Sequence, residues 1–307
     1  MIFHNTHEFK ISSPTAVALG CFDGVHLGHK AVISEAIASA KHLSVLSAVW
    51  CFEEPPKNFF FPNSARVITT VAQKAELISE LGVDVTVCVP FDNAIASLSP
   101  EEFFERILVE KMNAAHVVCG ANFRFGKNGI GDTKTLSKLC KEHGIGFSVQ
   151  SHVCADGMPV SSSAIREALM SGDIKTASAL LGRPYSISGK VINGNRLGRT
   201  LGFPTANIAI EDGGALLKNG VYVTRALVDG EAHYGITNVG KHPTVSPNIL
   251  LAETNLFDFC DDIYGKDIKI EFLEFIRPEV KFGSLDELSA QVQKDIETAK
   301  SFIAKKY

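Results

Sequence analysis

Residues 16–40 place the strongest constraint on the fold, because they combine a strand, a glycine-rich turn and the start of a helix. The apolar run at residues 16–19 predicts a strand, and apolar side chains at helical spacing between Val32 and Ala40 predict a helix. The turn between them reads Gly-Cys-Phe-Asp-Gly-Val-His-Leu-Gly-His at residues 20–29. Such a junction presents backbone N–H groups and the positive end of a helix dipole to an anion. Its spacing matches neither the dinucleotide fingerprint nor a Walker A loop.

Two histidines in this turn, His26 and His29, lie three residues apart and therefore on one face of the predicted helix start. Alone they are compatible with a simple helix cap, but the surrounding glycines, Phe22 and Asp23 make the pattern more specific. It resembles the HxGH signature of the nucleotidyltransferase superfamily, in the longer GxFDGxHxGH form of bacterial FAD synthetases. The resemblance leaves open whether Asp23 orients a histidine or a water on a metal. It implies that His26 and His29 are catalytic and that these residues bind ATP or FMN: Gly20, Phe22, Asp23 and Gly28.

The composition is that of a globular protein with two domains of ordinary size: 307 residues, 45% apolar and 21% charged. A net charge of −4 gives no electrostatic reason to expect a nucleic-acid partner. The N-terminus shows no secretory signal, and no apolar run is long enough to cross a bilayer. Seven scattered cysteines without a CxxC pair are typical of reduced thiols. We therefore expect a cytoplasmic protein with no membrane or nucleic-acid partner, and weak self-association stays open.

Predicted strands and helices alternate up to about residue 150. Apolar, β-branched runs predict strands at residues 45–52, 83–89, 116–119 and 147–150, with helices at 72–81, 99–111 and 132–143 between them. This alternation predicts an α/β, Rossmann-like domain with a mostly parallel, doubly wound sheet. Ligands in such sheets bind outside the carboxyl ends of the strands, and the turn at residues 20–29 is expected at such an end.

Three further stretches of the first half bear on the same site. Hydroxyls and an arginine open a predicted helix at residues 161–166, where they form a second anion cradle. This stretch resembles the ISSTxIR element that holds the ATP triphosphate in the same nucleotidyltransferases, with Ser163 in place of Thr and Ala164 in place of a common Arg. Residues 120–126 resemble the family's G-x-(D/N)-F-x-F-G element, whereas residues 52–56 lack the histidine of its F-x-P-H-P pattern and are assigned only a substrate-lining role. The implied ATP- or FMN-binding residues are Ser161, Ser162, Ser163, Arg166 and Asn122.

The character of the sequence changes after residues 182–184. Short β-rich runs separated by turn sequences, such as Asn193-Gly194 and Asp229-Gly230, extend from about residue 185 to residue 275. This spacing predicts an antiparallel sandwich or barrel. A final helix is expected from about Leu285, with Ser284 as its cap and Glu287 three residues later. We therefore predict two domains, residues 1–182 and 183–307.

The second domain carries its own motif at residues 198–207, which resembles the GRxLGFPTAN motif of riboflavin kinases. Residues 238–244 resemble the N-(I/V)-G-x-x-P-T turn of that family, and Glu253 matches the catalytic glutamate of its E-x-x-L-x-D-F strand. The resemblance implies a six-stranded riboflavin kinase-like barrel, in which Glu253 accepts the proton of the riboflavin 5′-hydroxyl. It also implies that Thr205 and Asn207 hold Mg²⁺. The implied ATP- or riboflavin-binding residues are Gly198, Arg199, Gly202, Pro204, Thr205 and Asn207.

Both motif sets occur in order across nearly the whole chain, which therefore resembles the prokaryotic bifunctional riboflavin kinase/FMN adenylyltransferase family. The resemblance implies phosphorylation of riboflavin to FMN by ATP, and then transfer of AMP from ATP to FMN to give FAD and pyrophosphate. Mg²⁺ is the implied cofactor, and ATP, riboflavin and FMN are the implied substrates. Two alternatives stay open: a monofunctional riboflavin kinase with a degenerate adenylyltransferase half, and a non-catalytic flavin-binding regulator.

Overall fold

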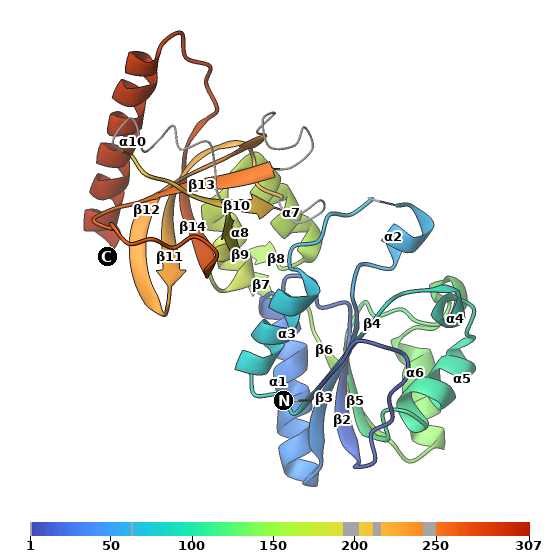
Figure 1. Cartoon of the computed structure of the whole chain (residues 1–307). Helices are drawn as coiled ribbons and strands as arrows, with labels where there is room; N and C mark the ends of the chain where they lie inside the picture. Colours follow the sequence, from blue (N-terminus) through green and yellow to red (C-terminus); the bar gives the residue numbers. More distant parts are fainter. Residues whose placement is uncertain (1, 63, 193–202, 211–215, 242–249) are drawn as a thin grey trace. The chain divides into compact units, whose positions relative to one another are not determined.

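The computed structural model describes residues 2–62, 64–192, 203–210, 216–241 and 250–307. The chain forms two compact units, Met1–Ser162 and Ser163–Tyr307. Figure 1 shows the first unit in blue to green and the second in yellow-green to red.

The first unit is built on a six-stranded sheet with the order β1-β4-β3-β2-β5-β6. Each pair of neighbouring strands is parallel, so the predicted doubly wound parallel sheet is confirmed. The chain moves from β2 through β3 to β4 toward one edge, and then returns to place β5 on the other side of β2. A topological switch point therefore lies between β2 and β5. The strands are β1 Ile2–His4, β2 Thr15–Leu19, β3 Leu46–Phe52, β4 Val85–Val89, β5 Ala114–Gly120 and β6 Gly146–Gln150.

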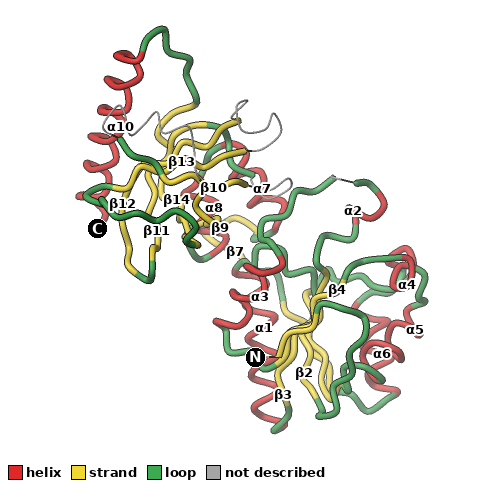
Figure 2. The backbone as a smooth tube through the Cα atoms, in the orientation of Figure 1, coloured by secondary structure: helices red, strands yellow, loops and turns green. Residues whose placement is uncertain are grey.

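Helices cover both faces of this sheet (Figure 2). Alternate residues of β2 point to opposite faces, so Ala18 belongs to the core beneath α1 and α3, whereas Leu19 belongs to the core beneath α5 and α6. The helices are α1 Leu27–Leu43, α2 Lys57–Phe60, α3 Val71–Glu80, α4 Asn93–Ala96, α5 Pro100–Phe103 and α6 Thr133–Glu142, with a 3₁₀ turn at Lys127–Gly129. A hairpin of β7 Cys154–Ala155 and β8 Met158–Pro159 follows the sheet.

The helix predicted at residues 99–111 differs from the observed one in its middle. It begins as expected, with Ser99 and Glu102 forming a reciprocal capping box. Its continuation, Phe104–Val109, is a π-helix, and just beyond it the Met112 amide donates to the Ile107 carbonyl at 2.9 Å, again five residues back. The wider turn places Ile107 and Met112, five residues apart, in the same core cluster.

The second unit contains a closed barrel with the strand order β10-β13-β12-β11-β14-β9. Its strand pairings are all antiparallel in the described residues, which confirms the expected six-stranded barrel. The predicted final helix is also confirmed, because Ser284 caps α10 by accepting a hydrogen bond from the Glu287 amide. The elements are α7 Ser162–Ser171, α8 Ile174–Leu181, β9 Tyr185–Ile192, β10 Ala206–Ile210, β11 Gly220–Val228, β12 Glu231–Lys241, β13 Leu250–Leu256, β14 Asp267–Pro278 and α10 Leu285–Lys306.

Helices outside the barrel cover parts of its wall. Ile296 and Ala299 of α10 pack against Val221 and Val223 of β11, and α8 contacts β9 and β14. The Leu169 carbonyl of α7 accepts a hydrogen bond from the Lys218 amide. By compactness α7 and α8 thus group with the barrel, and the compact units divide at Ser162.

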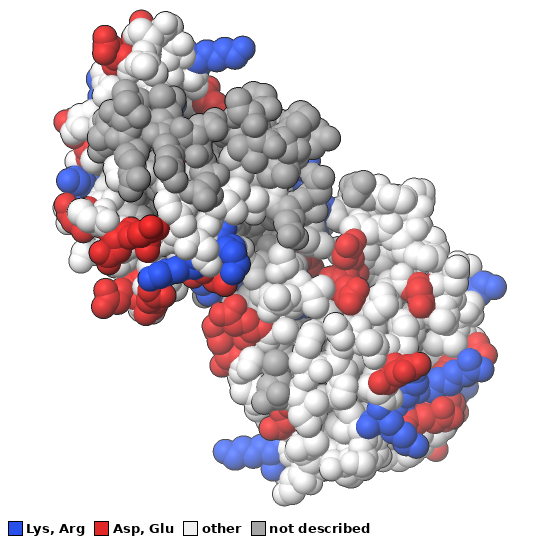
Figure 3. Space-filling view, viewed as in Figure 1, with Lys and Arg blue, Asp and Glu red and all other residues white. Residues whose placement is uncertain are grey.

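The surface carries both signs of charge. On the face drawn in Figure 3, acidic and basic side chains occur on each of the two units, as the small net charge of −4 leads one to expect. Among the helices in the described part of the chain, none is long and apolar enough to span a membrane.

Candidate active sites

The glycine-histidine turn and the GANFRFG stretch lie at the same place in the first sheet. Residues 20–26 follow β2, and residues 121–126 follow β5, which is the neighbour of β2 in the sheet. Both segments therefore leave the carboxyl ends of the two strands that flank the topological switch point. This is the position where open α/β sheets form their ligand crevice.

The turn after β2 adopts a backbone that most residues avoid. Phe22 and Val25 have left-handed backbone angles, with φ of 51° and 41°, and both side chains are buried. A Cβ added at Gly20 would lie 2.9 Å from the Phe22 ring, and one at Gly28 would lie 3.2 Å from the His26 ring. Such strain persists only where the surroundings fix it, and it concentrates at functional sites.

Asp23 fixes this turn to the chain before α3. Its buried carboxylate accepts hydrogen bonds from the amides of Ile68 at 2.9 Å and Thr69 at 3.2 Å. The Thr69 hydroxyl in turn accepts from the Gly24 amide at 3.1 Å. The sequence left open whether Asp23 orients a histidine or a water; the observed contacts make it an anchor of the turn.

The two histidines meet at the start of α1. His26 is the N-cap, and its Nδ1 accepts a hydrogen bond from the His29 amide at 3.2 Å. That bond requires an unprotonated Nδ1, so a neutral His26 carries its proton on Nε2. The two rings are stacked with centroids 3.5 Å apart, and Phe22 packs edge-on against His29 at 5.2 Å.

Electrostatics keep His29 neutral. Burial lowers the pKa of His29 well below its ordinary value, and the nearby charges of His26 and Lys74 lower it further. His29 Nδ1 is buried and has no hydrogen-bond partner among the described residues. A neutral imidazole with an unpartnered nitrogen beside a helix N-terminus is suited to hydrogen bonding with a ligand.

Ser162 contacts this turn directly, because its hydroxyl donates to the Asp23 carbonyl at 3.0 Å. Ser161 immediately precedes it, whereas Ser163 and Arg166 lie further along α7, in the second compact unit. Asn122 is exposed just beyond β5, and Phe125 beyond it is buried, with its ring 5.6 Å from that of Phe103.

Lys74 is a residue of this site that the sequence reasoning missed. It lies on α3 and is only 1% exposed, and its ammonium donates to the carbonyls of Cys21, Phe52 and Glu53. The available signal was its spacing, because Lys74 follows Val71 by three residues and precedes Ile78 by four on the apolar face of the helix.

The kinase-motif residues of the second unit meet across three strands. Asn207 of β10 pairs with Glu253 of β13, and Glu253 pairs with Asn238 of β12. Directly opposed residues of a sheet share one face, so these three side chains form a row on the barrel. Glu253 is half-buried and Asn207 is 3% exposed.

A second interaction holds the chain just before β10. Asn255, two residues after Glu253 on the same strand face, donates from Nδ2 to the Pro204 carbonyl at 2.9 Å. This bond fixes the position of the segment 204–207, which contains Pro204, Thr205 and Asn207. Sequence reasoning missed Asn255, and Gly198, Arg199, Gly202 and the stretch after Lys241 lie outside the described residues.

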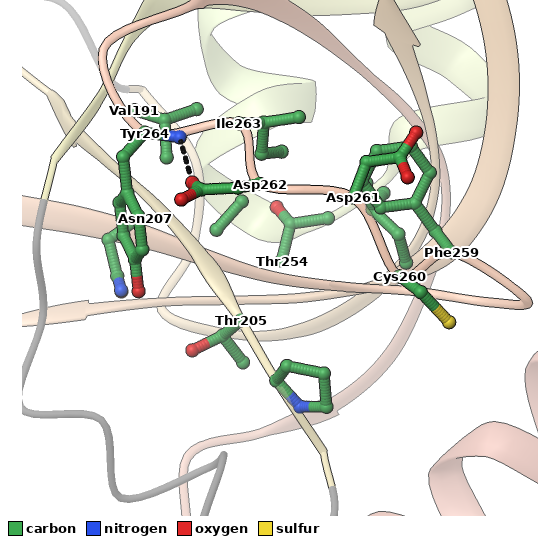
Figure 4. Close-up of a pocket in the computed structure, with 13 residues that line it drawn as sticks. Val191, Thr205, Asn207, Thr254, Phe259, Cys260, Asp261, Asp262, Ile263 and Tyr264 are labelled. Carbon is green, nitrogen blue, oxygen red and sulfur yellow. Dashed lines mark hydrogen bonds between the residues drawn. The ribbon is translucent and has the colours of Figure 1, made fainter.

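A pocket opens beside this segment at one end of the barrel (Figure 4). Figure 4 shows the loop from Phe259 to Tyr264 across the upper part of the view, Thr205 below it, and Asn207 on the same side of the view as Tyr264. Asp262 of this loop accepts a hydrogen bond from the Tyr264 amide at 3.1 Å. The pocket is lined by Val191, Pro204, Thr205, Ala206, Asn207, Thr254, Leu256, Phe259, Cys260, Asp261, Asp262, Ile263 and Tyr264.

The donor set of this pocket fits a hard cation. In the described ranges no three His, Cys, Asp or Glu side chains group as metal ligands. Asn207 Oδ1, however, is buried without a hydrogen-bond partner among the described residues, and the Thr205 hydroxyl belongs to the same pocket. Neutral oxygens of this kind suit Mg²⁺, which retains waters and phosphate oxygens as its other ligands.

A parallel sheet with a strained histidine turn at its switch point, joined to a six-stranded antiparallel barrel, defines a two-part transferase acting on nucleotides. The model of the FAD synthetase family matches residues 8–164, and that of the riboflavin kinase family matches residues 181–303. The chain belongs to the family of bifunctional riboflavin kinase/FMN adenylyltransferases.

Relatives and a solved structure support this assignment over the full length. A bifunctional riboflavin kinase/FMN adenylyltransferase from Haemophilus influenzae is 38% identical over 301 residues, covering 97% of each chain. The enzyme of the same description from Bacillus subtilis is 38% identical over 304 residues, covering 97% of this chain and 96% of its own. A crystal structure described as a macrolide-efflux protein from Streptococcus pneumoniae shares the fold, with a TM-score of 0.87 and 30% identity, covering 98% of this chain and 99% of the other.

Proposed function

We propose that the two reactions of this family are divided between the two sites, with riboflavin phosphorylation at the barrel and adenylyl transfer at the switch-point turn. The observation that carries this division is the row of Asn207 and Glu253 on β10 and β13, with the unpartnered Asn207 oxygen beside the pocket. A carboxylate and an amide oxygen in one row supply a candidate base and a candidate metal ligand for phosphoryl transfer, separate from the histidine turn.

At the barrel, the Glu253 carboxylate is the proposed general base. It accepts the proton of the riboflavin 5′-hydroxyl as that oxygen forms a bond to the γ-phosphorus of ATP. The bond between this phosphorus and the β,γ-bridging oxygen breaks, and ADP leaves. Thr205 and Asn207 hold Mg²⁺, which offsets the negative charge of the phosphates when bound. Gly198, Arg199, Gly202 and Pro204 bind ATP or riboflavin in this proposal.

At the switch point no protein nucleophile is needed. A phosphate oxygen of FMN attacks the α-phosphorus of ATP, the bond to the bridging oxygen breaks, and pyrophosphate leaves. His26 and His29 donate hydrogen bonds to the phosphoryl oxygens, and the N-terminus of α1 adds a positive partial charge. The proposed binding residues are Gly20, Phe22, Asp23, Gly28, Asn122, Ser161, Ser162, Ser163 and Arg166.

Two single substitutions test this division in the full-length chain. Glu253→Ala removes the proposed base and is expected to lower FMN formation by about 10²–10⁴-fold. It leaves the formation of FAD from added FMN unchanged. His29→Ala is expected to act in the opposite way, stopping FAD formation while FMN still accumulates. FMN and FAD are separated and quantified after incubation with riboflavin, ATP and Mg²⁺.

Each variant controls for the folding of the other half, because one activity must survive in each. Loss of both activities in a folded variant contradicts the two-site assignment. Wild-type protein that makes only FMN favours the monofunctional alternative. Flavin binding without ATP consumption favours the non-catalytic regulator.

The finer assignments belong to the same proposal. The functional domains are 1–182 and 183–307, which is supported by the kinase family model beginning at residue 181. A cytoplasmic location is supported by the seven cysteines, all of which are free thiols. The partners are small molecules, with no nucleic acid and no membrane, and weak self-association is left to measurement.

A further inference from the structure

Lys74 is a buried charge that the reactions described above do not use. Lysine is among the residues least often buried, because an ammonium removed from water is costly unless it is well bonded. Here all three N–H groups of an ammonium have carbonyl partners: Cys21 at 3.2 Å, Phe52 at 2.6 Å and Glu53 at 3.1 Å. A fully bonded cation therefore occupies a position on the apolar face of the helix.

The bonds of Lys74 join three segments at the carboxyl end of the sheet. Cys21 lies in the turn after β2, whereas Phe52 and Glu53 lie at the end of β3. The preceding residues Ile68 and Thr69 bind Asp23 in the same turn. The stretch from residue 68 to residue 74 is therefore hydrogen-bonded to the histidine turn at Cys21 and at Asp23, one on each side of Phe22.

The two points of attachment carry opposite charges. Asp23 and Lys74 are both only 1% exposed, and Asp23 acts electrostatically on Lys74. Burial lowers the pKa of Lys74, but the neighbouring thiols of Cys51, Cys21 and Cys88, together with Asp23, raise it above its ordinary value. The side chain is therefore a permanent cation next to the turn.

We propose that Lys74 is a positioning residue for adenylyl transfer: its ammonium holds the backbone of the turn in the strained form that presents His26 and His29, and adds a fixed positive charge beside them. This inference rests on the proposed roles of the two histidines. Lys74 acts through the turn and touches neither substrate.

The fixed charge has a consequence for pH dependence. The titratable groups acting on His29 are His26, stacked against it, and Lys74 from α3. Protonation of His26 on Nδ1 would break its cap on α1, and a second charge on His29 would repel the first. Lys74 is one of the causes that lower the pKa of His29, so removing Lys74 makes the His29 ring easier to protonate as the pH falls.

The test compares Lys74→Met and Lys74→Arg with the wild type in the full-length chain. For Lys74→Met we expect kcat/KM of FAD formation from FMN to fall by about 100-fold, the scale of a small misplacement of catalytic groups. The acid limb of its pH profile moves upward by about one pH unit. Lys74→Arg, which keeps the charge, retains the wild-type limb and recovers part of the rate. Lys41→Met removes an exposed lysine of α1 and is expected to change neither.

Riboflavin kinase activity in the same chains reports on folding and stays at the wild-type level. Rates of Lys74→Met within about threefold of wild type overturn the proposal, given the 100-fold expectation. The proposal is also overturned if the acid limb of the pH profile does not move in Lys74→Met and both variants lose the same fraction of kcat/KM. That result would show that Lys74 has only a structural role. If Lys74→Met does not fold, Lys74→Gln takes its place under the same criteria. His29→Ala, assayed alongside, separates failure of the histidine roles from failure of the Lys74 role.

Discussion

At the scale of single residues, the side chains that shape both sites are bound to backbone groups far away in the sequence. Asp23 binds the amide of Ile68, and Asn255 binds the carbonyl of Pro204. Lys74 reaches back to Cys21. None of these pairs has a spacing that a local pattern can detect, because helix and turn rules reach only a few residues. Each bond holds a segment that carries a motif. The motif can be recognised in the sequence, but the long-range hydrogen bond that positions it cannot.

Asn255 offers a prediction for the kinase site. Asn255→Ala leaves the Pro204 carbonyl without its buried donor, which costs about 1–3 kcal/mol and loosens the segment holding Thr205 and Asn207. We expect kcat/KM for riboflavin phosphorylation to fall by about tenfold, which corresponds to about 1.4 kcal/mol. Formation of FAD from FMN is the internal control and stays unchanged.

A matched variant shows whether the lower kinase rate comes from losing the Asn255–Pro204 bond or from losing any asparagine side chain in the unit. Asn219 donates to Glu279 in an exposed hydrogen bond of the same unit. Asn219→Ala is therefore expected to leave the kinase rate within about twofold, since exposed polar contacts contribute little. Equal losses in the two variants argue against a positioning role for Asn255.

At the scale of elements, the sequence predicted most of the sheet and helices, because strand and helix periodicities are local. The strand order β4-β3-β2-β5 could not be predicted from the sequence, because it depends on which face of the sheet each crossover connection covers. The sequence predicted only that the histidine turn follows a strand end, and related residues 120–126 to the same site by resemblance; the structure adds that both segments lie at the switch point. The short strands β1, β7 and β8 and the π-helix were missed, because each owes its form to packing more than to pattern.

The π-helix is tied to α6 by a histidine that gives a pH-dependent prediction. His143 Nδ1 lies 2.9 Å from the Leu139 carbonyl, and Nε2 lies 2.6 Å from the Glu105 carboxylate. The bond to the Leu139 carbonyl and then the pairing with Glu105 raise the pKa of His143 above its ordinary value. A raised pKa in the folded state means that the added stability is fully present below the unfolded value of about 6.5, and is lost as the pH rises through the folded value.

His143→Gln is therefore expected to lower the free energy of unfolding more at about pH 5.5 than at about pH 8. Urea unfolding of the full-length chain at the two pH values gives the comparison. His152→Gln, at an exposed position outside any helix or strand, serves as the reference. A loss for His143→Gln that does not change between the two pH values would falsify the ion-pair interpretation.

At the scale of the whole molecule, the histidine turn with its supports and the barrel pocket each lie within one compact unit, whereas Ser163 and Arg166, proposed for the first site, belong to the second unit. The histidine turn, Lys74 and Asn122 belong to the first unit, and the pocket around Thr205 and Asn207 belongs to the second. The relatives from Haemophilus influenzae and Bacillus subtilis match over nearly their whole lengths, so both halves are retained together. From its change in character the sequence predicts two domains that divide after residue 182, and this boundary stays a prediction; the compact units divide at Ser162. It did not predict that α7 and α8 pack with the barrel, because helix periodicity does not say which core a helix joins.

If the two reactions take place at separate sites, two variant chains that each lack one reaction should complement each other in a mixture. Because Glu253→Ala and His29→Ala leave the other unit intact, a mixture of the two variants is expected to convert riboflavin to FAD, although neither does so alone. FMN released from the barrel of one chain diffuses to the switch point of another, so FAD appears after a lag that shortens as protein concentration rises. The time courses of FMN and FAD in the mixture are compared with those of each variant and of the wild type. If the mixture accumulates FMN without FAD, the Glu253→Ala chains cannot use FMN from solution. FMN would then have to pass directly between the two sites of one chain.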